Sequence, residues 1–396
     1  MASAKLYFDF RDILRSPRIA LSGKKIWIFI VGNLIGFVSY WFLTYYSFYI
    51  SNYDLYSILD NYGLYPYIFN QNISKLSWLI YFLGILIWIS VLFISSTAVS
   101  RVTINQLKGN HFFSISDAWR YALKYWKSVI LTPIVILFII FLFLFIGTFF
   151  AFLSSISFIG TIIFSSLFPI YFFGSIFTIY TAIVLVNSLI YTPSIVSSYE
   201  EDIMGSIFEC YSISWSQPWR IILYGLILFI TILIGTEIFS WFIINAYNLI
   251  FFIFKYFMED NLVNITSLSL NIILPNSLID FILKLRETLI NLISNYHYKI
   301  PNLFDNNLYS IAKPISLFET FNSIILSTFL FIIGLSLISY SLTIFSVGQT
   351  LSFIILKKLT DGDNLLKRLN EDELKEKEDH YIFNTEEIKN NKNQKT

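Results

Sequence analysis

The chain has 396 residues, of which 56% are hydrophobic and 13% charged, with a mean hydropathy of +0.66, and this excludes a soluble protein in favour of an integral membrane protein. The 27 Lys and Arg nearly balance the 26 Asp and Glu, which excludes the basic field that nucleic-acid binding requires. One cysteine and three scattered histidines provide neither a disulfide nor a metal cluster, so we expect no metal and no cofactor.

Six segments are apolar enough to cross the hydrocarbon core, which takes about 20 helical residues. The fifth stays apolar as far as Phe257, and the sixth also exceeds one crossing, so we expect tilt or a stretch outside the bilayer. The stretch Ser157 to Phe168 is too short to span, and we interpret it as an interfacial or partly buried turn. We predict an all-α polytopic membrane helix bundle over residues 1–357, followed by a charged cytoplasmic tail at 358–396. The predicted spans are 26–50, 76–99, 129–153, 170–191, 221–244 and 324–356.

The distribution of Lys and Arg predicts the orientation, because basic residues are retained on the cytoplasmic side. The segments before the first span, between the second and third, between the fourth and fifth, and after the sixth hold 21 of them together. The opposite side holds six. Both termini are therefore predicted to be cytoplasmic.

Two surface helices are predicted, one between the second and third spans and one between the fourth and fifth. Their apolar positions share a constant offset of 89 residues, which indicates an internal repeat. Such amphipathic helices also serve as ordinary anchors in the headgroup layer, and this is the simpler interpretation. The two series are Ile115, Ala118, Trp119, Ala122, Trp126 and Met204, Ile207, Phe208, Tyr211, Trp215. The predicted interfacial anchors are Trp119, Trp126, Trp215 and Trp219.

The outer loop at 258–319 is long for a connector and has an apolar helical stripe of its own from Leu278 to Leu292. This stripe would lie on the outer leaflet, cap the bundle or dock a partner.

Few polar groups lie inside the spans. Glu237 is the only ionisable residue within one, and an intramembrane carboxylate is a candidate proton or substrate site. By our topology it lies near the outer interface, where an ordinary interfacial carboxylate explains it equally well. Asn33 and Asn187 would line a cavity or, more simply, bond one helix to another. Prolines 133, 169 and 193 lie near predicted span ends and give weak evidence for broken transporter helices.

Two stretches resemble uncharacterised multi-pass bacterial membrane proteins. They are VSRVTINQLKGNHFFSISDAWRYALKYW at 99–126 and YTPSIVSSYEEDIMGSIFECYSISWSQPWRIILY at 191–224, and the matched region covers about a third of the chain. Those proteins are distantly similar to the membrane domain of some glycerophosphodiester phosphodiesterases. The resemblance implies a six-span protein of the bacterial inner membrane and no chemistry, because the phosphodiesterase domain is absent from this sequence.

The leading hypothesis is a non-enzymatic scaffold, assembly or lipid-organising protein, since interfacial elements are abundant and buried polar groups are scarce. The expected partners are membrane lipids, with a protein partner at the surface helices or outer loop left open. The alternative is a transporter or lipid-moving permease that uses Glu237 as its coupling group. An enzyme would need paired acid and base groups, which the spacing of residues does not show. Substrate, partner identity, oligomeric state and the surroundings of Glu237 are left open.

Overall fold

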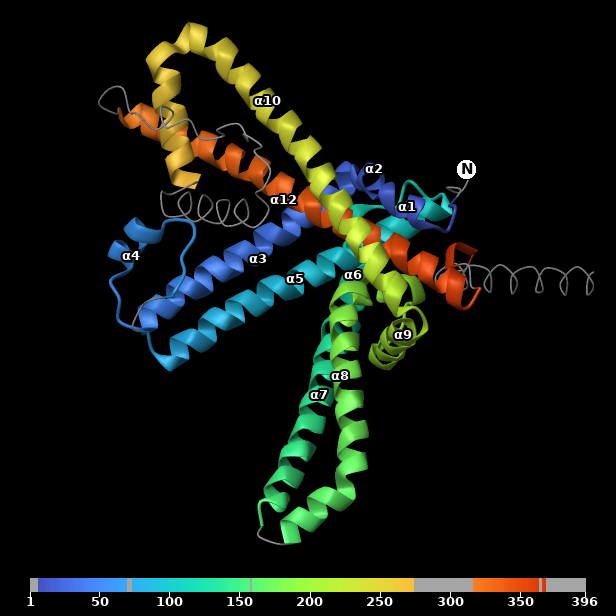
Figure 1. Cartoon of the computed structure of the whole chain (residues 1–396). Coiled ribbons are helices and arrows are strands. Elements are labelled where there is room, and N and C mark those ends of the chain that lie inside the picture. The colour runs from blue at the N-terminus through green and yellow to red at the C-terminus, as the bar shows by residue number, and fades with distance from the viewer. Residues whose placement is uncertain (1–5, 70–72, 157–158, 274–315, 363–364, 368–396) are drawn as a thin grey trace, which may run out of the picture. The chain divides into compact units, whose positions relative to one another are not determined.

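The structure, a computed structural model, describes residues 6–69, 73–156, 159–273, 316–362 and 365–367. Over these ranges the chain forms helices and no strand, and six of the helices are long and apolar enough to cross a membrane (Figure 1). The prediction of an all-α membrane protein with six spans is therefore confirmed. The six are α3 (Gly23–Ile50), α5 (Lys75–Lys108), α7 (Trp126–Ser154), α8 (Ile159–Tyr199), α10 (Pro218–Ile273) and α12 (Leu317–Thr360).

Several of the short helices begin at residues whose side chains accept hydrogen bonds from the first backbone N–H groups. Asp54 accepts hydrogen bonds from the amides of Tyr56 and Ser57 at the start of α4 (Leu55–Tyr62). Asp202 accepts one from Gly205 N at the start of α9, as expected for an acidic residue at a helix N-terminus. The remaining short elements are α1 (Phe10–Leu14), α2 (Ser16–Ala20), α6 (Ile115–Lys124), α9 (Ile203–Ser216) and a 3₁₀ turn at Leu365–Lys367.

The chain divides into two compact units. The first comprises Met1–Ile28, Phe93–Ile232 and Leu342–Thr396, and the second comprises Phe29–Leu92 and Leu233–Ser341. Helices α3, α5, α10 and α12 each contribute one part to each unit, whereas α6, α7, α8 and α9 belong entirely to the first.

In the first unit, small hydroxyl residues join α5, α8 and α12. Ser100 and Ser346 lie 3.3 Å apart between their hydroxyl oxygens, and Thr350 donates to Ser100 at 3.0 Å. Ser96 donates to Ser346 at 3.0 Å, and Ser194 lies 3.4 Å from Thr350. Residues four apart share one helix face, so Ser96 and Ser100 meet Ser346 and Thr350 along a single seam. Small side chains let membrane helices approach closely, and their hydroxyls then bond across the contact.

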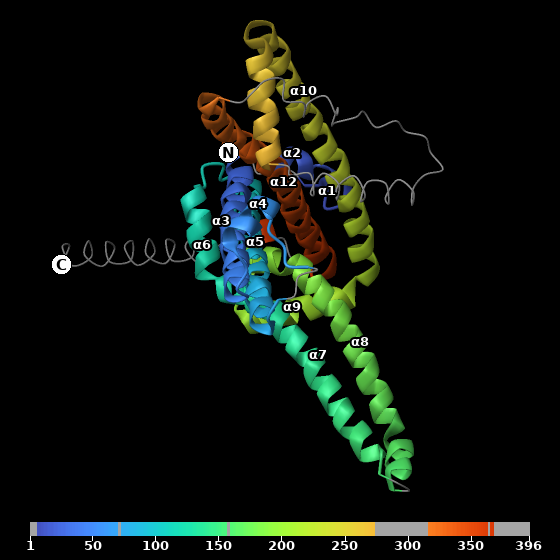
Figure 2. The ribbon, with the colours of Figure 1, turned by 90° about the vertical axis from the view of Figure 1, so that its left-hand side faces the viewer.

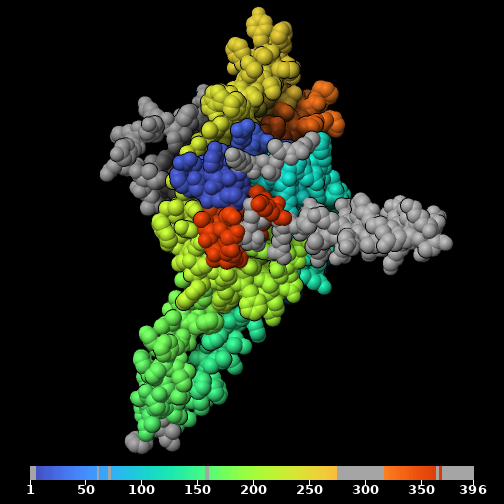
Figure 3. Space-filling model, turned by 90° about the vertical axis from the view of Figure 1, so that its right-hand side faces the viewer, coloured from blue at the N-terminus to red at the C-terminus, as the bar shows by residue number. Residues whose placement is uncertain are grey.

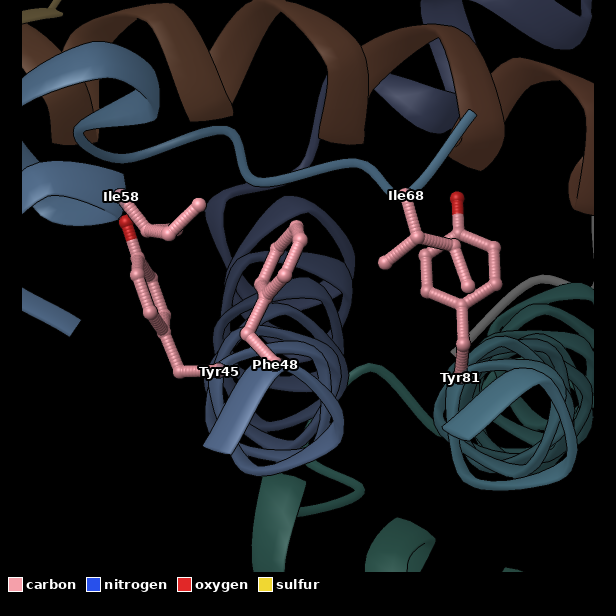
Figure 4. Close-up of a cluster of buried hydrophobic side chains, with 5 residues drawn as sticks. All are labelled: Tyr45, Phe48, Ile58, Ile68 and Tyr81. Carbon is pink, nitrogen blue, oxygen red and sulfur yellow. The ribbon is translucent and has the colours of Figure 1, made fainter. Parts of the chain in front are cut away.

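In the second unit, the loop after α3 folds back over the ends of α3 and α5. Tyr45 and Phe48 from α3, Tyr81 from α5, Ile58 from α4 and Ile68 from the loop form one buried cluster (Figure 4). Tyr45 also donates to the carbonyl of Gly63 at 2.7 Å. The cluster gives the loop a core of its own, a feature that hydropathy along the chain did not predict.

Helices α7 and α8 form a hairpin within the first unit and run side by side (Figures 1 and 2). Aromatic side chains join them, with ring centroids 5.0 Å apart for Phe143 and Phe177. The space-filling view shows the side chains of the two helices next to each other along the hairpin (Figure 3). The predicted turn at 157–168 is wrong over residues 159–168, which form the first turns of α8. Pro169 lies inside that helix, because one missing backbone hydrogen bond does not break a long membrane helix. Pro133 and Pro193 likewise lie inside α7 and α8.

The predicted outer loop at 258–319 begins inside α10. The backbone at Glu259 has φ 44° and ψ −121°, and there the helix reverses its direction (Figure 1). The returning segment packs on α12 in the second unit, since Ser269 donates to the carbonyl of Ser323 at 3.0 Å and Asn264 to Glu319 at 3.2 Å. The predicted helix at 278–292 and most of the tail at 358–396 lie outside the described residues.

The two predicted surface helices are present as α6 and α9, but the buried face of α9 differs from the predicted one. In α6, Ala118 and Ala122 are buried as the pattern indicated. In α9 the buried face is centred on Cys210, and Met204, Phe208 and Trp215 point outward. The helix is apolar on both sides, so a search for one apolar stripe selected residues from both.

Candidate functional site

The most unusual polar group in the first unit is Arg101 of α5. This helix has 34 residues and is about 51 Å long, well beyond the 30 Å or so of a hydrocarbon core. Arg101 lies about 39 Å along it from Lys75, a distance greater than the thickness of the hydrocarbon core. Nevertheless the residue is only 3% exposed, because α6 and the end of α8 cover it.

Three contacts hold the Arg101 guanidinium. One terminal nitrogen lies 2.6 Å from Oε1 of Glu200, and the other donates to the carbonyl of Ser197 at 3.0 Å. The guanidinium carbon lies 4.1 Å from the centre of the Tyr121 ring, and the Tyr121 hydroxyl donates to the carbonyl of Val196 at 2.8 Å. The Arg101 Nε–H is buried and has no hydrogen-bond partner among the described residues. This nitrogen is therefore left as a charge-assisted donor for a further acceptor.

The backbone at Glu200 is adapted to this pairing. The residue follows the end of α8 and has φ 59°, in the left-handed region that side chains other than glycine rarely adopt. Such a conformation costs on the order of 1 kcal/mol, and it persists where surrounding contacts fix it, often at functional sites. Here the Glu200 amide donates to the carbonyl of Val196 at 3.1 Å, which ends α8, and the side chain pairs with Arg101.

A cavity of about 460 Å³ opens beside this ion pair. Its charged lining residues are three cations, Arg101, Arg120 and Lys124, and two carboxylates, Asp117 and Glu200, so it has a net positive charge. Each carboxylate is paired with an arginine. Glu200 pairs with Arg101, and Asp117 lies 3.6 Å from Arg120. Aromatic rings complete the wall: Phe113, Tyr121 and Tyr125.

The site forms because only a short connection, residues 109–114, separates α6 from α5. Ser114 accepts from the amide of Asp117 at 3.0 Å and donates to its carboxylate at 2.6 Å, which fixes the first turn of α6. Positions 117, 120, 121 and 124 then lie on one face of the helix, because residues three and four apart share a face. This face presents its charges to the cavity.

The three predicted polar site residues do not come together. Asn33 is buried in the second unit and donates to the hydroxyl of Ser339 at 3.3 Å. Asn187 is buried in the first unit and donates to Ser214 of α9 at 2.8 Å. Glu237 is exposed in the second unit, in a shallow groove lined only by residues of α10: Leu233, Ile234, Ile238 and Trp241. The two amides each join two helices, and the carboxylate faces outward.

The predicted anchors differ in exposure. Trp119 is half-buried, and Trp126, Trp219 and Trp215 are 43%, 66% and 78% exposed. The Trp215 ring lies edge-on to Tyr180, with centroids 5.8 Å apart.

Sequence reasoning missed Arg101 and Tyr121 as site residues. It placed Arg101 in a connector after a span ending at Val99, and it did not single out Glu200 as a site residue. The available signal was an arginine only two residues beyond an apolar span, directly after a run of small residues, SSTAVS.

Comparison of the chain with protein-family models, with curated proteins and with solved structures finds no significant match. The resemblance to the membrane domains of glycerophosphodiester phosphodiesterases therefore stays a prediction.

Proposed function

We propose that this chain is a non-enzymatic lipid-organising protein of the bacterial inner membrane, with both termini in the cytoplasm, and that it binds anionic lipid headgroups in the Arg101 cavity. The observation that carries the proposal is the buried Arg101, whose Nε–H has no partner among the described residues while its two terminal nitrogens bond to Glu200 and Ser197. Arginine presents its donors in a planar fork that matches the oxygens of a phosphate group.

The charge and depth of the cavity support this ligand. A net positive cavity at headgroup level matches the phosphodiester of an anionic lipid, and the 21 basic residues on the same predicted side match the negative cytoplasmic leaflet. The carboxylates of Asp117 and Glu200 face arginines, which disfavours their use as general acid or base. This pairing supports binding in preference to catalysis.

The test compares two double variants of the full chain in lipid nanodiscs at 0.5 M salt, which screens diffuse surface attraction. Arg120→Gln with Lys124→Gln removes two cations from the cavity wall, and Arg18→Gln with Lys127→Gln removes the same charge from exposed positions outside it. At about 1 kcal/mol for each lost donor, the first variant should retain phosphatidylglycerol about thirtyfold more weakly by native mass spectrometry. The second should lose less than about threefold. Equal losses in both variants would reject the headgroup site.

The scaffold part of the proposal concerns the surface helices. Trp126 and Trp215 are both exposed beside spans, where they would seat the protein in the headgroup layer or meet a protein partner. Alanine at both positions should weaken membrane seating or the co-purification of a partner from native lipid particles. Wild-type assembly and localisation of that variant would count against this role.

A further inference from the structure

A second cavity lies within the first unit, between the membrane helices α8, α10 and α12. It has a volume of about 250 Å³, and apolar side chains such as Ile190, Leu228 and Phe345 make up most of its lining. Three polar side chains, Tyr191, Gln349 and Ser352, also line it. A cavity so largely apolar, with a small polar group of residues, is the usual form of a site for an amphipathic small molecule.

Gln349 lines this cavity with a buried side-chain donor that lacks a hydrogen-bond partner in the part of the chain that the structure describes. It is 1% exposed, and its Nε2 donor has no hydrogen-bond partner among the described residues. A buried amide donor without a partner is rare and destabilising, so each one requires an explanation. Its neighbour Thr350 shows the ordinary arrangement, since its hydroxyl lies within hydrogen-bond distance of the Ser100 hydroxyl and of the Ser346 carbonyl.

The polar groups gather at one part of the cavity. Ser352 lies three residues after Gln349, on the same face of α12, and it faces the Tyr191 hydroxyl. Tyr191 and Ser352 are 3% and 1% exposed. An amide N–H and two hydroxyls can all donate, so they match a ligand that offers a carbonyl oxygen.

The mouth and the depth of the cavity indicate the source of that ligand. Two lining residues, Phe229 and Phe345, are 59% and 38% exposed within apolar spans, so the cavity opens on a surface that faces hydrocarbon. Gln349 lies about 12 Å along α12 before Lys357, so it lies deeper in the span than the basic end of that helix.

We propose that this cavity binds the acyl chain of an ester-linked membrane glycerolipid, whose ester carbonyl accepts a hydrogen bond from Gln349 Nε2. The apolar lining holds the first methylenes of the chain. This site is independent of the headgroup cavity at Arg101, because it recognises the ester and not the charge.

The test uses two lipids with the same zwitterionic headgroup, dioleoylphosphatidylcholine and its diether analogue without carbonyls. Delipidated wild-type protein in detergent micelles should bind the ester lipid about three- to tenfold more tightly by native mass spectrometry, the effect of one net hydrogen bond. Gln349→Leu keeps the side-chain size, so it should fold normally and bind both lipids equally. Gln106→Leu on α5, outside the cavity, should keep the wild-type preference.

Two results would overturn the proposal. Equal binding of ester and ether lipids by the wild type would mean that Gln349 holds a buried water and no lipid carbonyl. An ester preference that survives in Gln349→Leu would place the selective contact elsewhere. If Gln349→Leu unfolds, Gln349→Met, also unable to donate, replaces it with the same expected loss of preference. Failure of the phosphatidylglycerol test leaves these results unchanged, because no net lipid charge is involved.

Discussion

The Arg101–Glu200 ion pair permits the sharpest test of the first unit. Replacing Arg101 by Met removes the 2.6 Å ion pair, the bond to Ser197 and the contact with the Tyr121 ring in one step. Both side chains of the pair are nearly inaccessible, at 4% and 10% exposed. Breaking a buried pair costs about 3–5 kcal/mol, because one charge stays buried without its counterion. We therefore expect Arg101→Met to lower the free energy of unfolding by about 3–5 kcal/mol.

The double variant separates the cost of a lone charge from the value of the pair. Changing both Arg101 and Glu200 to Met removes both desolvation penalties, and the backbone strain at position 200 is the same for Met as for Glu, since neither is glycine. The double variant should lie within about 1 kcal/mol of the wild type, although it should no longer bind the headgroup. Unfolding in mixed micelles with increasing SDS measures the wild type, the two single variants Arg101→Met and Glu200→Met, and the double variant. A loss below about 1 kcal/mol for Arg101→Met, or additive losses in the double variant, would refute the reasoning.

Three further predictions concern other contacts. Burial raises the pKa of the Cys210 thiol to about 12, so N-ethylmaleimide at pH 7.5 should label the folded chain at least a hundredfold more slowly than the unfolded chain, as followed by intact mass. A methyl group at Gly36 would overlap the Trp88 indole, so Gly36→Ala should cost about 1–3 kcal/mol in the SDS titration, and no loss would show that the helices are farther apart. Thr350→Val removes the bond to Ser100 at nearly constant shape and should cost about 0.6 kcal/mol, and a loss above about 2 kcal/mol would contradict an ordinary interhelical bond.

Hydropathy predicted the spans because the membrane imposes their length and composition locally, residue by residue along the chain. It could not predict the burial of Arg101, because burial depends on Glu200 and Tyr121, which belong to other helices. The count of basic residues that predicts orientation also points away from a buried Arg101, because it treats each arginine beside a span as exposed to solvent. The cluster around Phe48 was missed for the same reason, as its members come from two spans and the loop between them.

The predicted internal repeat relates one lining position of the first cavity to one of the second. The offset of 89 residues pairs Arg101 with Ile190 and Tyr121 with Cys210. The local geometry agrees, since α6 begins 14 residues after Arg101 and α9 begins 13 residues after Ile190. At matching positions the first copy thus has a charged residue beside a polar cavity, and the second copy has an isoleucine that lines the apolar one. The copies differ further, because α6 lines the first cavity whereas α9 contributes no residue to the second.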